Sequence, residues 1–240
     1  MGFHPSQPEQ EKLVRDFFAG AAHGFFVEVG ANHPTEGSQT WHLEQLGWTG
    51  VLVEPQPDLA AFLVTARKAK VFAAACSSPD NAGRSLSLHV DGARSGLDRE
   101  RMAPGSHAAY TIMVPIRTLD DILGEAAAPA PIDLLSVDVE GHEVEVLRGF
   151  EFKRWQPRLI LVEDHVGSLQ THRYLKRSGY RLVRRIGNDG WYVPDSAAVR
   201  VGISDRWEIL RKYYLALPFR MARNVSRRYR RLLADWWTGR

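Results

Sequence analysis

The most chemically rich segment of the chain begins at Asp138 and reads Asp-Val-Glu-Gly-His-Glu. It places the acidic side chains of Asp138 and Glu140 next to the imidazole of His142, and Gly141 lets the backbone turn sharply between them. Histidine is the side chain best suited to exchange a proton near neutral pH. His142 and Asp138 are therefore candidate catalytic residues. The alternative is a capped helix with carboxylates on its surface.

A second group of this kind consists of Glu163, Asp164 and His165, which end a later apolar run. His165 is a rival to His142 as the catalytic base. Asp138, Glu163 and Asp164 together offer carboxylate oxygens, the donors that hard divalent cations prefer, so these three residues are candidate ligands of such a cation. The alternative is that Glu163 orients a base and Asp164 caps a turn.

Two acidic residues nearer the N-terminus indicate a cofactor. Glu28 lies in the apolar run 25–29, just before Gly30, and Glu54 ends the run 50–54. With a helix between them, these runs predict a strand, helix and strand of a parallel α/β sheet, in which ligands bind at the carboxyl ends of the strands. We expect Glu54 to accept hydrogen bonds from both hydroxyls of a ribose.

The glycine pattern indicates which cofactor this is. A pyrophosphate needs the pattern Gly-x-Gly-x-x-Gly, but Asn32 and Thr35 stand at the second and third glycine positions, and Pro34 has no N–H to donate. A cofactor without phosphates fits better, so we expect S-adenosylmethionine. Its cationic sulfonium and ammonium groups account for an acidic Glu28. The alternative is that Glu28 and Glu54 only cap strands in salt bridges.

The hydrophobic pattern predicts the elements that position these residues. The strands at 85–90 and 110–116 alternate with period two and are expected to pair antiparallel, and the loop 91–108 between them is long enough to be a lid. The predicted helices cover 8–19, 37–46, 57–68 and 168–178, with another beginning at 118. The predicted strands cover 25–29, 50–54, 71–75, 85–90, 110–116, 132–138, 159–163, 180–186 and 191–193.

The composition is typical of a protein that has one sizeable hydrophobic core and resides in a reducing compartment. The chain has 240 residues and is 44% hydrophobic, which is enough to bury such a core. Its lone cysteine excludes an intramolecular disulfide, its N-terminal residues are charged rather than signal-like, and no run is long and apolar enough to span a membrane. We therefore expect a cytoplasmic protein.

Charge divides the chain near residue 200. Residues 200–240 contain eleven Lys or Arg against three acidic residues, a net charge of +8 that leaves −5 for residues 1–199 out of the total of +3. We expect a core domain over 1–199 and a basic amphipathic helical tail over 200–240, which suits the anionic cytoplasmic face of a membrane. The alternative is that the tail packs on its own domain or on a second copy of the chain. No specific nucleic acid is expected, because the core is acidic.

Four ordered blocks of sequence resemble the FkbM family of methyltransferases, over roughly residues 20–185. The blocks are Val29-Gly30-Ala31-Asn32, Gly47 to Pro55, Val114 to Asp120, and Leu134 to Glu143 followed by Leu147-Arg148-Gly149. The resemblance implies a Rossmann-like class I fold with seven mostly parallel strands and helices on both faces. It also implies S-adenosylmethionine-dependent O-methylation of a hydroxyl on a saccharide, glycan or secondary metabolite, and a lipid-linked glycan would suit the basic tail.

The resemblance also implies roles for individual residues of the site. Ala75, Cys76 and Ser77 match the place where this fold packs the adenine, although Cys76 also reads as a small buried residue. The metal set at Asp138 and Glu163 is similar to the magnesium site of macrocin-type sugar O-methyltransferases. The alternative functions are RNA methylation and a non-catalytic module that keeps the cofactor fold. The expected cofactor-binding residues are Glu28, Gly30, Ala31, Asn32, Ser38, Glu54, Pro55, Ala75, Cys76, Ser77 and Asp138.

Overall fold

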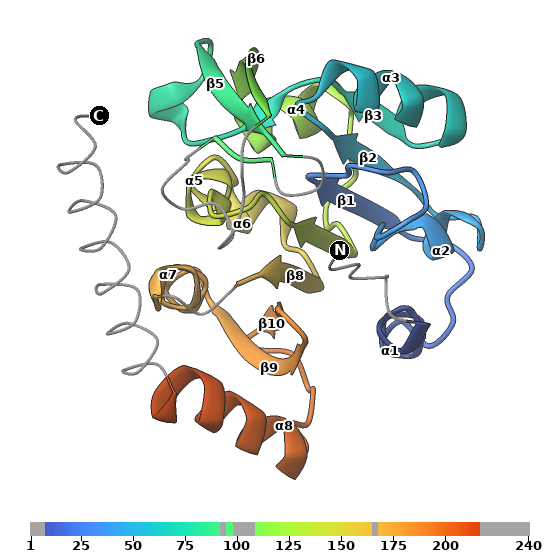
Figure 1. The fold of residues 1–240 in the computed structure, drawn as a ribbon. Helices are drawn as coiled ribbons and strands as arrows, with labels where there is room; N and C mark the ends of the chain where they lie inside the picture. Colours follow the sequence, from blue (N-terminus) through green and yellow to red (C-terminus); the bar gives the residue numbers. More distant parts are fainter. Residues whose placement is uncertain (1–7, 92–94, 98–108, 165–167, 217–240) are drawn as a thin grey trace, which may run out of the picture. The chain divides into compact units, whose positions relative to one another are not determined.

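A computed structural model describes residues 8–91, 95–97, 109–164 and 168–216 of the chain (Figure 1). Contacts divide the chain into two compact units, Met1–Glu163 and Asp164–Arg240. Among the described residues, the main sheet has seven strands and is mostly parallel, with five strands in the first unit and two in the second. The predicted α/β fold class is therefore confirmed.

The first unit holds the parallel strands. Their order is β3 (Lys70–Phe72), β2 (Thr49–Val53), β1 (Phe25–Val29), β7 (Leu134–Val137) and β8 (Leu159–Glu163). The central strands are buried almost throughout, as expected of parallel strands covered on both faces. This burial explains why they read in the sequence as unbroken apolar runs rather than as alternating patterns.

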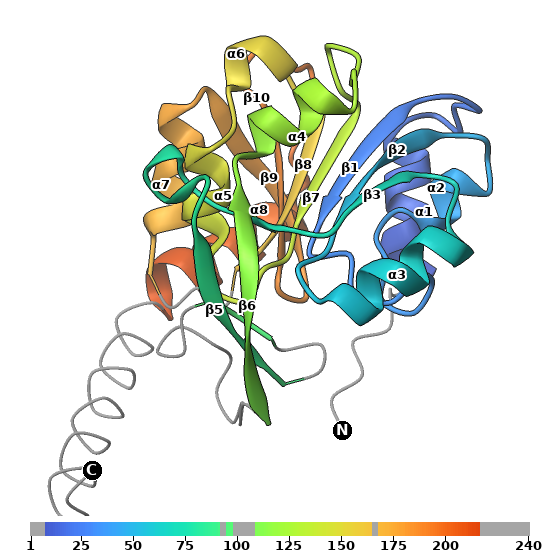
Figure 2. The ribbon, with the colours of Figure 1, turned by 90° about the horizontal axis from the view of Figure 1, so that it is seen from above.

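Helices cover both faces of these strands, as predicted. In Figure 2, α1 (Pro8–Phe17), α2 (Trp41–Glu44) and α3 (Pro57–Ala66) lie on one side of the strands. The helices α4 (Leu119–Glu125), α5 (Glu143–Arg148) and α6 (Phe152–Trp155) lie on the other side. The α4 helix begins at the expected N-cap, because the Thr118 hydroxyl accepts a hydrogen bond from the Asp121 N–H at 3.1 Å.

A smaller sheet joins β4 (Ala75–Cys76), β6 (Tyr110–Arg117) and β5 (Ser85–Val90), and a 3-10 turn at Pro79–Asn81 lies between β4 and β5. The predicted antiparallel pairing of β5 with β6 is confirmed. The single strand predicted over 71–75 is wrong. The chain leaves the main sheet after β3, and Ala75 pairs with Ile116 of β6 instead.

The second unit contains α7 (Gln170–Arg177), the antiparallel strands β9 (Tyr180–Ile186) and β10 (Asp189–Pro194), and α8 (Ile203–Ile209), which continues as a π-helical segment at Leu210–Leu215. Tyr213 is only 1% exposed and packs against Leu169, Leu182 and Ile209. The predicted domain boundary at residue 200 stays a prediction. Residues 217–240 of the predicted tail lie outside the described residues.

Candidate functional site

The register of the parallel strands brings the predicted site residues to one edge of the sheet. Val29 at the end of β1 aligns with Val53 of β2 on one side and with Val137 of β7 on the other. Gly30, Glu54 and Asp138 each follow one of these aligned residues. The carboxyl edge of the sheet therefore carries all three, as the order of strands predicted.

Gly30 makes the first turn at this edge, and the structure gives the reason for a glycine. Its φ is +84°, a left-handed conformation, and a Cβ there would stand 1.8 Å from the backbone oxygen of Asp138. The Gly30 and Ala31 N–H groups both donate to the oxygen of Val53, at 2.9 and 3.1 Å. These contacts hold the turn against the ends of β2 and β7, where no side chain would fit.

Glu54 is the acidic residue best placed to meet a ligand. Its carboxylate accepts hydrogen bonds from the N–H groups of Asn32 at 2.8 Å and Gln56 at 2.9 Å. The residue is only 3% exposed, and this burial raises the pKa of its carboxyl, while the two backbone bonds oppose the rise. Glu54 is therefore a fixed, largely dehydrated acceptor at the end of β2.

A pocket opens at this edge within the first unit. It encloses about 540 Å³ of empty space, part of which is open solvent. The predicted cofactor residues that line it are Gly30, Asn32, Glu54, Pro55, Ala75, Cys76 and Asp138, and the candidate base His142 also lines it. Lining residues that were not predicted include Gln56, Leu88, Leu97, Val139 and Glu140.

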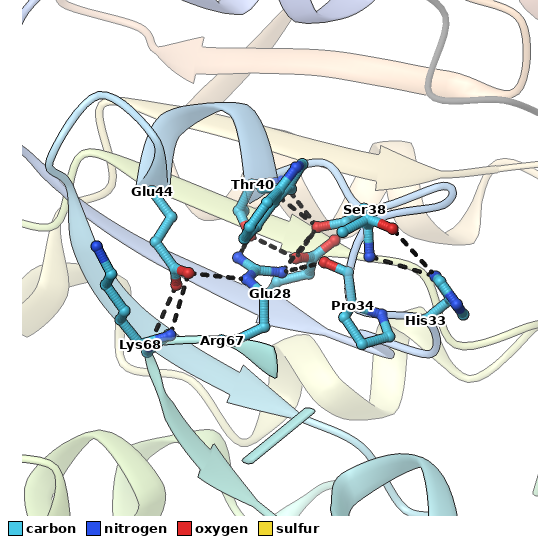
Figure 3. A network of polar contacts seen from close by, with 11 residues as sticks. Glu28, His33, Pro34, Ser38, Thr40, Glu44, Arg67 and Lys68 are labelled. Atoms are coloured by element: carbon cyan, nitrogen blue, oxygen red, sulfur yellow. Dashed lines mark hydrogen bonds and ion pairs between the residues drawn. The ribbon is translucent and has the colours of Figure 1, made fainter. Parts of the chain in front are cut away.

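Glu28 and Ser38 do not line the pocket. The Glu28 carboxylate accepts hydrogen bonds from Ser38 Oγ at 3.0 Å, Thr40 Oγ1 at 2.5 Å and the Gln39 N–H at 2.7 Å (Figure 3). Burial raises the pKa of Glu28, and these bonds together with Arg67 oppose the rise. Its position anchors the segment before α2, and its expected contact with the cofactor stays a prediction.

Arg67 completes this buried network, and its side chain is 0% exposed. It donates to Ser38 Oγ at 3.1 Å and Thr40 Oγ1 at 3.0 Å, and it pairs with Glu44 at 3.2 Å (Figure 3). A buried charge needs such partners, since loss of one leaves the other uncompensated. No local pattern singles out Arg67, because its partners come from segments more than twenty residues away.

His142 stands at the N-cap position of α5, with its ring tied to a buried serine. Its Nε2 lies 3.0 Å from Ser77 Oγ, which also accepts a hydrogen bond from Asn81 Nδ2 at 3.0 Å. Ser77 was expected at the adenine, but it is not among the pocket-lining residues. Its position beside His142 is that of a residue that orients the candidate base. Asn81 had no sequence signal.

The predicted metal ligands are brought together in part. Val137 aligns with Val162, so Asp138 and Glu163 end neighbouring strands. Asp138, Glu140 and Glu163 each offer a carboxylate oxygen, and these oxygens lie within 4.8 Å of one another. Glu140 was not among the predicted ligands, and its φ of +52° marks the tight turn that follows Asp138.

Asp164, the third predicted ligand, belongs to the second unit and is engaged there. Its N–H donates to the oxygen of Asn188 at 2.9 Å, and its side chain accepts a hydrogen bond from the Tyr213 hydroxyl at 3.3 Å. Its backbone oxygen accepts a hydrogen bond from Arg185. His165, the rival base, lies outside the described residues.

Cys76 contributes packing rather than reactivity. The thiol is buried in β4, and burial raises its pKa to about 12. A thiol of such pKa is neutral near pH 7 and is a weak nucleophile. The interpretation of Cys76 as a small buried residue in the pocket wall is consistent with this.

The mostly parallel seven-stranded sheet, with a pocket at the carboxyl ends of its strands, defines a class I methyltransferase fold. The Methyltransferase FkbM domain matches residues 28–182, more than half of the chain, so the chain belongs to the FkbM methyltransferase family. The chain is also similar to a protein named Methyltransferase 1 from Beauveria bassiana (strain ARSEF 2860), with 41% identity over 90 residues. That alignment covers 36% of this chain and 35% of the relative.

Proposed function

We propose that this methyltransferase uses S-adenosylmethionine and methylates a hydroxyl of a saccharide, glycan or secondary metabolite. The observation that carries the proposal is the buried Glu54 carboxylate, held by two backbone N–H groups beside the Gly30 turn. A carboxylate has acceptor sites to spare for the two hydroxyls of a ribose. The turn after Gly30 lacks the glycines that a pyrophosphate needs, so the residues fit a nucleoside without phosphates.

Each residue at the edge has a distinct task in this proposal. Bound S-adenosylmethionine supplies a methyl group on an activated sulfonium, so the protein contributes mainly orientation. Glu54 holds the ribose, and the small residues Ala75 and Cys76 form a wall for the flat adenine. With the cofactor bound, the His142 imidazole would accept the proton of the acceptor hydroxyl, whose oxygen would bond the methyl carbon as the carbon–sulfur bond breaks and S-adenosylhomocysteine leaves.

Transfer of a labelled methyl group tests the proposal. The full-length protein is incubated with methyl-labelled S-adenosylmethionine and an extract of the cells that produce it, fractionated into saccharides, lipid-linked glycans, small metabolites and RNA. We expect label in a saccharide or metabolite fraction, as a methyl ether identified by mass spectrometry. Label in RNA would instead support the alternative acceptor, and cofactor binding with no transfer to any fraction would support a non-catalytic module.

Binding of a magnesium ion stays a prediction, with Glu140 in place of Asp164 among its expected ligands. Asp138, Glu140 and Glu163 offer carboxylate oxygens, the donor type that hard divalent cations prefer. If the ion is required, a chelator abolishes methyl transfer, added Mg²⁺ restores it, and calorimetry detects Mg²⁺ binding that Glu163→Gln weakens. Full activity in chelator, with no heat of Mg²⁺ binding, would exclude an exchangeable catalytic metal.

A further inference from the structure

The helix α8 and the segment after it carry an exposed apolar stripe. Ile203 is 89% exposed and Trp207 is 59% exposed, and Leu210 and Tyr214 are exposed as well. The four residues follow one another at spacings of four, three and four, which places them along one side of a helix. Large apolar side chains gathered in this way mark an interaction surface.

The opposite side of the same helix is occupied within the second unit. Tyr213 is buried, and its hydroxyl accepts a hydrogen bond from Arg185 of β9 at 3.0 Å. Asp205 of α8 pairs with Arg184 of β9 at 3.1 Å. Because these contacts hold α8 against β9, the stripe cannot turn inward without breaking them.

Charge indicates what covers the stripe. Residues 200–240 carry a net charge of +8, and the acidic side chain of Glu208 is already paired with Arg211 and Lys212. A second copy of the chain that docked through the same stripe would bring the same positive charge to the contact and be repelled. An anionic lipid surface is complementary to it, and tryptophan and tyrosine are favoured at the membrane–water interface.

We propose that the stripe Ile203, Trp207, Leu210 and Tyr214 docks the protein on an anionic lipid surface. Among the helices that the structure describes, none is long and apolar enough to cross a membrane. The apolar side chains enter the interfacial layer, and the net positive charge of residues 200–240 favours anionic headgroups. This docking goes beyond methyl transfer and does not depend on it.

Co-sedimentation of the full-length protein with vesicles tests the docking. We expect binding to vesicles of phosphatidylglycerol and phosphatidylcholine in equal parts, and the binding should weaken as salt rises. The variant Ile203→Ser/Trp207→Ser/Leu210→Ser should lose more than about tenfold in affinity, since three apolar side chains no longer leave water. Its thermal unfolding should match the parent's, because these side chains are exposed in the folded chain.

A matched control replaces two exposed apolar side chains of another helix, Phe62→Ser/Val64→Ser in α3. This control should bind vesicles as the parent does. Equal binding by the stripe variant, or equal binding to pure phosphatidylcholine vesicles, would overturn the proposal. So would a dimer in sedimentation velocity that the stripe variant dissociates, if the parent does not bind vesicles.

Discussion

At the scale of single residues, two buried glutamates show how the same residue type takes different tasks. Glu28 lies in β1, Glu54 directly follows the adjacent parallel strand β2, and both have a pKa raised by burial. Glu54 accepts two backbone N–H bonds and lines the pocket, whereas Glu28 is surrounded by the hydroxyls of Ser38 and Thr40. Glu54 thus faces the pocket, where we propose that it binds the cofactor, while the Glu28 carboxylate organises the segment before α2.

The candidate base gives a prediction at this scale. His142→Ala should lower methyl-transfer turnover about a hundredfold or more, because the acceptor hydroxyl loses its proton acceptor. The affinity for S-adenosylmethionine, measured by calorimetry, should stay within about twofold, since Glu54 rather than His142 holds the ribose in this account. Unchanged turnover would make His142 a histidine on the helix surface and leave His165 as the candidate base.

A variant at Ser77, next to His142, distinguishes a positioning role from a catalytic role. It contacts the ring of His142 at 3.0 Å but does not line the pocket. Ser77→Ala should therefore lower turnover less than His142→Ala does, and it should shift the pH dependence of kcat/KM, because the imidazole loses a hydrogen-bond partner. A fall in turnover without any shift in the pH profile would indicate a packing role for Ser77.

At the scale of elements, the approach of β1 to β7 depends on one missing side chain. Gly30→Ala should destabilise the protein by about 2–5 kcal/mol, because the Cβ collides with the Asp138 oxygen and the backbone has a positive φ. Denaturant unfolding measures this change. Gly124→Ala in α4 is the control. Its Cβ meets nothing within 4 Å, so it should be neutral or stabilising by up to about 1 kcal/mol. Equal stability of both variants would contradict the close approach.

The strands were predictable from the sequence, whereas some local breaks were not. An apolar run that ends in a glycine or an acidic residue marked β1, β2 and β7 to within a residue or two at the edge that matters. The helix predicted over 37–46 covers only Trp41–Glu44, because the residues just before it bind the Glu28 carboxylate. Such contacts between distant residues leave no periodic pattern of hydrophobic residues in the sequence.

The same limit applies to the site. The carboxyl ends of parallel strands could be placed by topology alone, so Gly30, Glu54 and Asp138 were found. Glu140 and Asn81 could not be, since their positions depend on the tight turn after Asp138 and on the path from β4 to the 3-10 turn. The sequence predicted the edge of the sheet correctly, and the turns decided which further side chains lie there.

At the scale of the whole molecule, the chain separates two kinds of surface along its length. The pocket lies entirely in the first unit, and the exposed stripe of α8 lies in the second. Residues 1–199 carry a net charge of −5 and residues 200–240 carry +8. A chain built in this way can hold a small cofactor in one part and meet an anionic surface with another.

Calorimetric titration with S-adenosylmethionine tests the central claim most directly. We predict micromolar binding, about −8 kcal/mol, and no comparable binding of NAD. Glu54→Gln should lower the affinity for S-adenosylmethionine about ten- to a hundredfold, because two ribose hydroxyls lose a charged acceptor. The control Glu125→Gln changes an exposed residue of α4 and should leave this affinity unchanged. Tight NAD binding, or equal affinity in Glu54→Gln and the parent, would contradict the account.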